Sequence, residues 1–418
     1  MKFGKVGQIT LVPAIALIVA TLFTACTSTL TVGFMYVATN KQTPGQIEVY
    51  EVNSESGALR TIPTSPFPSG GRNPVAEVPA SDSKNLYVVN EDDNNVVQFG
   101  IGNDGKLYPQ STVNTPGSFP LAVALNSTNS YLYGVDTLQP VAGCSLTNAC
   151  PGDVFVCPIN TDGSLGTPVN GTNQCTNYYP LQLKASDTAT VLTPTAINLT
   201  TDGKYLYVAA FNATTSKGYL FAYTANSDGT LTSLNGNAPY LLESQAANKS
   251  TPSALLEPVA LASDSGSQFL YIVDKLSNQV ATYTLTNGAL SSTTPATIAT
   301  TNITAPTGNQ PSAITFAGNF LYVSNSLDST VNGYSISSGS LTNIGTYASD
   351  TNPIAIAGDP RKIGFLYTVN FLGNSLSGYQ INPTSGALVN TKNTPYASTV
   401  QPTAIAGIPH GGTTTAAK

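Results

Sequence analysis

The stretch "KNLYVVNEDDNNVVQFGIGNDGKL", residues 84–107, contains two short apolar runs joined by a polar turn and ends on Gly-x-Leu. The runs 86–89 and 96–99 are rich in β-branched and aromatic residues, which is typical of strands. The "NDG" sequence at 103–105 favours a tight hairpin, since glycine accepts a positive φ angle at little cost. This stretch therefore predicts two antiparallel strands followed by a hairpin into a third.

The same outline recurs seven times along the chain. Most copies open with an x-Pro step, and every copy has a tyrosine in a β-rich run and closes with Gly-x-Leu. The tyrosines and glycines, in chain order, are Tyr36, Tyr87, Tyr133, Tyr207, Tyr271, Tyr322 and Tyr367, and Gly57, Gly105, Gly163, Gly229, Gly288, Gly339 and Gly386. A repeat of roughly 45 to 50 residues with four short strands is typical of a β-propeller blade. We expect an all-β, seven-bladed β-propeller with four-stranded blades; an eight-stranded sandwich is the alternative, but it does not predict seven equal copies.

The two ends of the repeat region indicate how the ring closes. The first copy starts at its second strand, "FMYVAT" (34–39), and has no Pro-led first strand before it. The last Pro-led segment, "PTAIAGI" (402–408), has no second strand after it. We predict that 402–408 pairs beside 34–39 and completes the first blade, which removes exposed sheet edges.

The N-terminus has the layout of an export signal. Lys2 and Lys5 precede an apolar run, and "FTAC" (23–26) resembles the lipobox of bacterial lipoproteins, in which the cysteine is acylated. We expect a signal peptide at 1–25, lipidation at Cys26, a tether at 26–33, a single propeller at 34–410 and a flexible tail at 411–418. The protein would then be exported and lipid-anchored on the periplasmic or cell-surface side of a bacterial membrane. An ordinary secreted protein and an uncleaved anchor are the alternatives, although the run is short for a membrane span.

The remaining four cysteines, Cys144, Cys150, Cys157 and Cys175, lie within one copy of the repeat. An even number of cysteines in an exported chain favours two disulfides over a zinc site, which would need closer ligand pairs and histidines. Cys144–Cys150 with Cys157–Cys175 is the preferred pairing. Hairpin register, which would set Cys150 opposite Cys175, leaves another pairing open.

Composition excludes some functions. The formal net charge of -6 argues against nucleic acid as a partner, because phosphate binding needs a basic surface. His410 is the only histidine, and we expect it on the face opposite the channel mouth, where a histidine-based mechanism has no place. We expect a monomer.

Candidate site residues come from the loops that enter each Pro-led strand and from the ends of the tyrosine strands. Acids held in a desolvated pocket can act near neutral pH, so Glu257, Asp136 and Asp274, with Arg72 for an anionic ligand, are the candidate catalytic residues. The candidate ligand-binding residues at the channel mouth are Asn73, Asn90, Glu91, Gln310, Asn325, Asn352, Asn370 and Gln401. Short polar side chains also cap strand ends by binding their own backbone, which is the structural explanation for the same pattern. An oxygen-rich funnel would suit a sugar, a polyol or a Ca²⁺ ion.

The stretches "NPVAEVPASDSKNLYVVNEDDNNVVQFGIGNDGKL", "TPTAINLTTDGKYLYVAAFN" and "QPSAITFAGNFLYVSNSLDSTVNGYSI" resemble the seven-bladed propeller lactonases of the 6-phosphogluconolactonase type and the related YVTN repeat proteins. The resemblance implies a lactone hydrolase or isomerase acting on a sugar or muconate-like lactone. This chain keeps Arg72 in "GGRNP" and Asn90-Glu91 in "VVNE", but no histidine accompanies them.

Three hypotheses about function follow. We favour a lipid-anchored binding or scaffold module that presents its channel mouth to an envelope protein, a glycan or another ligand. The second hypothesis is the lactone hydrolase or isomerase, acting on a small anionic lactone or a related compound. The third is a structural repeat protein of the envelope.

Overall fold

The computed structural model describes residues 31–40, 44–169, 172–185, 187, 189–244, 253–291, 303–362 and 364–410. The predicted signal peptide, the lipidation site Cys26 and the tail 411–418 lie outside the described residues. No helix in the described part of the chain is long and apolar enough to cross a membrane.

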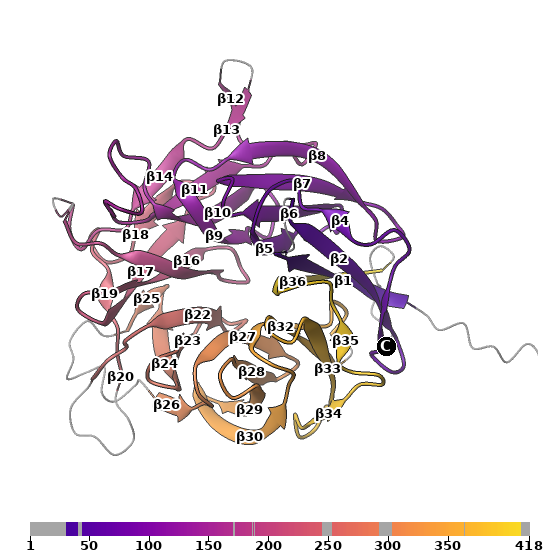
Figure 1. The fold of residues 1–418 in the computed structure, drawn as a ribbon. Helices are drawn as coiled ribbons and strands as arrows, with labels where there is room; N and C mark the ends of the chain where they lie inside the picture. Colours follow the sequence, from indigo (N-terminus) through magenta and orange to yellow (C-terminus); the bar gives the residue numbers. More distant parts are fainter. Residues whose placement is uncertain are drawn as a thin grey trace, which may run out of the picture.

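The described residues form seven antiparallel sheets arranged in a ring (Figure 1). The first strands of successive sheets contact one another around the ring, in the order β36, β5, β9, β15, β22, β27, β31 and back to β36. The seven blades predicted from the repeat are therefore confirmed. Their strands, from the first outward, are in blade 1 β36 (Pro402–Pro409), β1 (Thr31–Thr39), β2 (Gln46–Asn53), β3 (Leu59–Thr61) and β4 (Phe67–Pro68); in blade 2 β5 (Pro74–Pro79), β6 (Asn85–Asn90), β7 (Asn95–Ile101) and β8 (Leu107–Asn114); in blade 3 β9 (Ser118–Leu125), β10 (Tyr131–Leu138), β11 (Asp153–Pro158) and β14 (Asn177–Pro180); in blade 4 β15 (Thr193–Leu199), β16 (Tyr205–Asn212), β17 (Lys217–Ala225), β18 (Leu231–Ser233) and β19 (Tyr240–Leu241); in blade 5 β22 (Pro258–Ser263), β23 (Phe269–Asp274), β24 (Gln279–Thr286), β25 (Ala289–Leu290) and β26 (Ile303–Pro306); in blade 6 β27 (Pro311–Ala317), β28 (Phe320–Asn325), β29 (Thr330–Ser337) and β30 (Ser340–Ala348); and in blade 7 β31 (Pro353–Gly358), β32 (Phe365–Asn370), β33 (Ser375–Ile381), β34 (Leu388–Asn390) and β35 (Tyr396–Ala397).

The ring closes as the sequence predicts. Strand β36 pairs antiparallel with β1, with Gly33 opposite Pro409 and Thr39 opposite Pro402. The C-terminal strand thus supplies the innermost strand of the blade that begins at the N-terminus.

The ring has two distinct faces. We call the face on which the first strands begin and the second and third strands are joined the mouth face; it carries Pro74 opposite Asn90 in blade 2 and the equivalent positions of the other blades. The opposite face carries the Gly-x-Leu turns, and we call it the hairpin face. His410 follows the last residue of β36 and donates its backbone N–H to Val32, so it lies on the hairpin face, as predicted.

The repeated tyrosine and glycine hold neighbouring blades together on the hairpin face. The hydroxyl of Tyr36 donates to the carbonyl of Gly105 in the next blade, at 3.1 Å. The same contact recurs at four more places, from Tyr87 to Gly163, Tyr207 to Gly288, Tyr322 to Gly386 and Tyr367 to Gly57. The last of these crosses the closure of the ring. The two most regular features of the repeat therefore serve the fold.

The hydrophobic core is divided among the interfaces between blades. Between blades 1 and 2, for example, Phe34 and Tyr36 pack with Leu86, Val88 and Phe99. Each of the other interfaces has a comparable buried cluster. Burial of such apolar surface is the main stabilising contribution to the ring.

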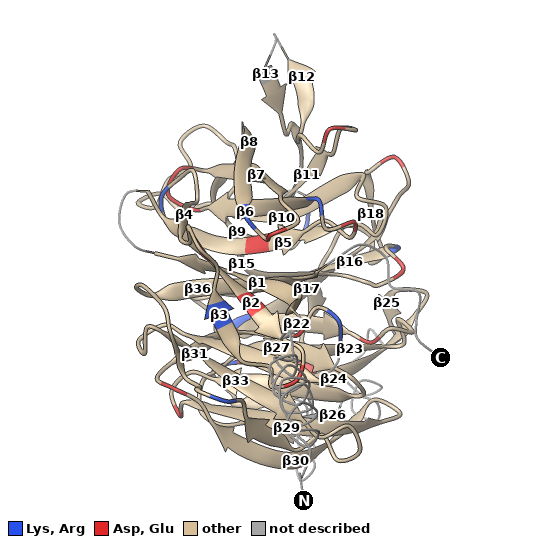
Figure 2. Cartoon of the chain, turned by 90° about the vertical axis from the view of Figure 1, so that its right-hand side faces the viewer, with Lys and Arg blue, Asp and Glu red and all other residues tan. Residues whose placement is uncertain are grey.

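Blade 3 departs from the pattern. It contains the disulfides Cys144–Cys150 and Cys157–Cys175, so the preferred pairing is confirmed. A two-stranded hairpin, β12 (Thr167–Val169) and β13 (Thr172–Gln174), projects from the rim of this blade in both views (Figures 1 and 2). Cys175 directly follows β13, and its disulfide joins the base of this hairpin to the third strand of the blade.

Candidate functional site

On the mouth face, the polar residues that end the second strands hold the loops that enter the first strands. Both carboxylate oxygens of Asp274 accept backbone N–H groups, from Glu257 at 2.8 Å and Leu256 at 3.0 Å. Asn325 accepts the N–H of Gly308 at 3.1 Å in the same way. These contacts are what the structural explanation for the Asn and Asp pattern requires.

Three of the candidate ligand-binding residues are fully buried within their blades: Asn90, Asn325 and Asn370. Their amide groups donate to neighbouring side chains, as Asn90 does to Asn95 at 2.9 Å. A ligand at the mouth could not reach these three side chains without displacing such contacts.

Four other candidates remain at least partly exposed: Asn73, Gln310, Asn352 and Gln401. Each directly precedes a proline and has a left-handed backbone, with φ between 45° and 62°. Such a conformation is costly for a residue other than glycine, so the surroundings must hold it. The turn of the preceding blade does so in three cases, since Asn278, Ser329 and Asn374 accept the N–H of Gln310, Asn352 and Gln401.

Arg72 and Glu91 lie beside Asn73 at the start of blade 2. The Arg72 guanidinium pairs with Asp93 at 2.7 Å, and this hydrogen-bonded pair lowers the pKa of the Asp93 carboxyl. Asn73 donates to Glu91 at 2.6 Å, and partial burial raises the pKa of Glu91. Arg72 is half exposed but already paired, so an anionic ligand would have to compete with Asp93.

Glu257 and Lys275 form an ion pair at the mouth end of blade 5, with 3.0 Å between Lys275 Nζ and Glu257 Oε1. Asp274 is adjacent, because it accepts the backbone N–H of Glu257. The four candidate catalytic residues are therefore spread over three blades, and only Glu257 and Asp274 contact each other.

A buried carboxyl pair in blade 3 was only half anticipated. Asp136 was a candidate, and β-sheet register places Asp153 directly opposite it. Asp136 accepts the N–H of Gly117 at 2.7 Å, whereas neither oxygen of Asp153 has a hydrogen-bond partner. Burial raises the pKa of both carboxyls, and the neighbouring charge of Asp136 raises that of Asp153 further. The signal that could have found Asp153 is its position, since the first residue of the third strand faces the last residue of the second in every blade.

A second unanticipated carboxyl is Glu77 on β5, at the interface of blades 1 and 2. Both of its oxygens are buried without a hydrogen-bond partner, and burial raises its pKa well above the usual range. The equivalent positions of the other blades carry branched aliphatic residues: Val123, Ile197, Leu261, Ile314, Ile356 and Ile405. Aligning the repeat would therefore have marked Glu77 as the exception.

Metal-binding groups do not gather in the part of the chain that the structure describes. No three His, Cys, Asp or Glu side chains lie together there as ligands. Calcium at the mouth stays a prediction, to be tested with backbone carbonyl and amide oxygens in mind.

The mouth face also carries exposed apolar side chains. Leu276, Leu327 and Leu372 occupy equivalent positions in the turns of blades 5, 6 and 7, and they are 53%, 63% and 60% exposed. Val141 and Leu146, in the long turn of blade 3, are exposed as well. Single exposed apolar residues are ordinary, but the same one at three successive turn tips is a patterned surface feature.

Known proteins place the chain in a family. The family model "Lactonase, 7-bladed beta-propeller" matches residues 33–140 and 260–405, more than half of the chain. No curated protein matches the sequence significantly. A candidate 6-phosphogluconolactonase from Bacteroides fragilis NCTC 9343 has 20% identity and a TM-score of 0.68 over 91% of this chain and 99% of its own. The periplasmic gluconolactonase of Pseudomonas aeruginosa has 21% identity and a TM-score of 0.68 over 90% of this chain and 99% of its own. The fold and the family model together assign this chain to the seven-bladed β-propeller lactonase family.

Proposed function

We propose that the protein is an exported, lipid-anchored binding module whose mouth face docks an envelope protein. The two disulfides and the export signal ending at Cys26 support an extracytoplasmic location. A propeller suits this role because its rigid ring presents loops that can differ from blade to blade.

The observation that carries this proposal is the row of leucine tips, Leu276, Leu327 and Leu372. Apolar side chains on a surface with few charges favour a protein partner, since their burial supplies affinity without paired charges. The candidate catalytic residues point the same way: Asp136 and Asp274 are buried, while Arg72 and Glu257 are each paired with an opposite charge.

Site-specific photo-crosslinking in intact cells tests the proposal. A photoreactive residue at position 327 or 372 is expected to capture the same protein partner. The matched control is Val389 on β34, which is 66% exposed but lies on the outer part of blade 7. Equal capture from position 389, or no specific product from either tip, would contradict docking at the mouth face.

Family membership supports a second candidate function, the hydrolysis or isomerisation of a sugar or muconate-like lactone. The residues that would carry it are Glu257 with Lys275 and Asp274, because this is the one place where candidate acids and a cation contact one another. A partly buried carboxylate held in this way can act as a general base.

A panel of sugar and muconate-like lactones tests the second candidate. Turnover by the protein that Glu257→Gln removes, with the melting temperature unchanged, would establish it. Glu51→Gln, which removes an exposed ion pair with Arg60 in blade 1, is the matched control and should keep full activity. Absence of turnover on the whole panel would leave the binding module as the function.

A further inference from the structure

One contact recurs at three successive interfaces between blades. The third residue of the third strand accepts a backbone N–H from the loop that follows the preceding blade. Glu48 accepts from Thr399 at 2.7 Å, Asn332 from Gly308 at 3.1 Å and Ser377 from Asp350 at 3.0 Å. The contact is the same in each case, but the side chains decrease in size from Glu to Asn to Ser.

The largest of these side chains fills its interface. Between blades 7 and 1, the second carboxylate oxygen of Glu48 also accepts the hydroxyls of Tyr50 and Ser398, both at 2.7 Å. Between blades 6 and 7, Ser377 is too short to reach across the same space. A pocket of about 210 Å³ lies there, lined by Ala348, Ser349, Asp350, Ser377, Asn390, Thr394 and Pro395.

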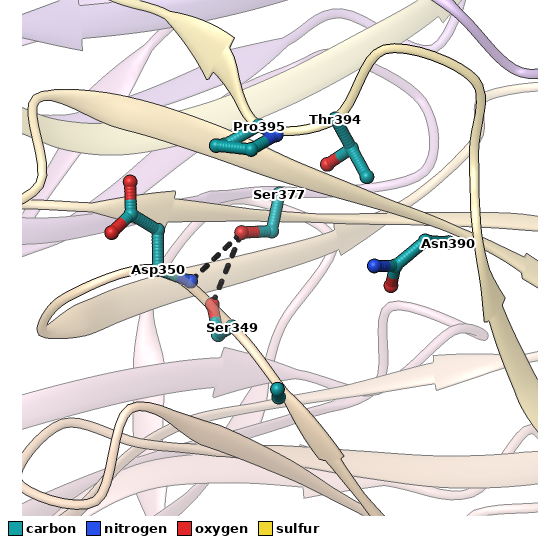
Figure 3. A pocket seen from close by; sticks show the side chains of 7 residues that line it. Ser349, Asp350, Ser377, Asn390, Thr394 and Pro395 are labelled. Atoms are coloured by element: carbon teal, nitrogen blue, oxygen red, sulfur yellow. Dashed lines mark hydrogen bonds between the residues drawn. The ribbon is translucent and has the colours of Figure 1, made fainter.

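The side chains that face this pocket are neutral and polar. Figure 3 shows the hydroxyls of Ser349 and Ser377 on one side and the Asn390 amide and Thr394 hydroxyl on the other. Thr394 accepts the N–H of Gly378 at 2.8 Å, which leaves its hydroxyl proton for another acceptor. Asn390 is exposed, and its amide can both donate and accept.

The one charged residue of the lining is held away from this space. The Asp350 carboxylate accepts the Ser375 hydroxyl at 2.7 Å and the N–H of Thr351 at 2.7 Å, and these bonds lower its pKa. Asp350 is therefore ionised at neutral pH, and no lysine or arginine lines the pocket to balance it. An anionic ligand is disfavoured here.

We propose that the pocket between blades 6 and 7 binds a neutral polyol or a single sugar unit. Its volume corresponds to about seven waters, at roughly 30 Å³ each, which is the size range of such a molecule. Hydroxyls and amides that both donate and accept match the mixed donor and acceptor pattern of a polyol. The site is separate from the leucine tips of the mouth face, so it does not rest on the proposed docking function.

Ligand-observed saturation-transfer NMR with D-glucose, myo-inositol and glycerol at millimolar concentration tests the proposal. Transfer to at least one of these probes is expected, and none to gluconate, which is an anion. Ser377→Asn introduces the residue that this chain has at the equivalent position 332, so the variant should fold while it narrows the pocket. It should weaken binding by roughly tenfold or more, since it removes both space and a hydroxyl partner.

A second variant keeps the test decisive if Ser377→Asn lowers the melting temperature. Asn390→Ala changes only an exposed side chain and should also weaken binding, while Asn382→Ala, an exposed asparagine in the turn before β34, should not. No transfer to any of the three neutral probes would overturn the proposal. Equal transfer in the wild type and in both pocket variants would overturn it as well.

Discussion

The two faces of the ring are built on different principles. On the hairpin face, a tyrosine hydroxyl reaches a glycine carbonyl of the next blade in five nearly identical contacts. On the mouth face, the ties between blades vary in residue type, and the turn tips range from acidic in blade 2 to apolar in blades 5, 6 and 7. The difference teaches that the conserved geometry of the repeat stabilises the ring, while recognition depends on the face where the copies differ.

Removing the strand that both faces share should have the largest effect. Deletion of residues 400–418 takes away β36, so β1 loses its partner and blade 7 loses its neighbour. We expect loss of cooperative unfolding, measured by circular dichroism and calorimetry, because the exposed inner edge would break the closed ring. A truncated protein that melts within a degree or two of the parent would refute this account of closure.

The next effect separates close packing from backbone freedom on the hairpin face. Gly386 and Gly236 both have left-handed φ angles, of 71° and 61°, but only at Gly386 would a Cβ lie 2.5 Å from Phe320 of the preceding blade. Gly386→Ala should therefore cost about 2–4 kcal/mol of unfolding free energy, against about 1 kcal/mol for Gly236→Ala. Chemical denaturation measures both, and equal losses would show that the contact between blades contributes nothing.

On the mouth face, the Asp136–Asp153 pair should make stability depend on pH. Because burial raises the folded-state pKa of both carboxyls, the folded protein keeps protons that the unfolded chain releases above pH of about 4. The free energy of unfolding should then fall as pH rises from there through the raised pKa values. Asp153→Asn should flatten this dependence and raise stability at pH 8 by roughly 2 kcal/mol.

Denaturation curves at several pH values check this, with Asp82→Asn as the control because Asp82 is exposed. An unchanged slope in Asp153→Asn would mean that the pair does not hold a proton.

The smallest effect tests one hydroxyl at a time. Tyr322 donates to Gly386 at 2.7 Å, whereas the hydroxyl of the equivalent Tyr271 is buried without a partner. Tyr322→Phe should cost about 1–2 kcal/mol, and Tyr271→Phe should be neutral or slightly stabilising. If thermal denaturation shows the same loss for both, the tyrosines act through their rings alone.

Much of the fold follows from the spacing of a few residues. The positions of the x-Pro steps, tyrosines and Gly-x-Leu turns predict the blade number, the strand pairing and the closure through 402–408. The disulfide pairing also follows, because each bond joins cysteines that are neighbours along the chain. These features repeat, so one correct alignment of the copies determines all of them.

The site was harder to predict because it depends on what each side chain contacts. Asn90, Asn325 and Asn370 have the composition of a polar funnel, but burial within their blades could not be known from residue type alone. The pocket between blades 6 and 7 exists because Ser377 is shorter than Glu48, which is informative only once both are known to face the same kind of loop. Aligning the copies position by position would have marked Glu77 and Asp153, but not their lack of hydrogen-bond partners.

The antiparallel pairing of β1 with β36 has a consequence for orientation in the cell. Because Gly33 lies opposite Pro409, the polypeptide enters and leaves the propeller at one pole of its axis, and that pole is the one remote from the leucines. A fatty-acylated Cys26 would be only five residues from Thr31, a leash of at most about 17 Å. So short an attachment would keep the disc close to the lipid with its recognition loops pointing outward, and an affinity tag at either terminus would immobilise it in that same orientation.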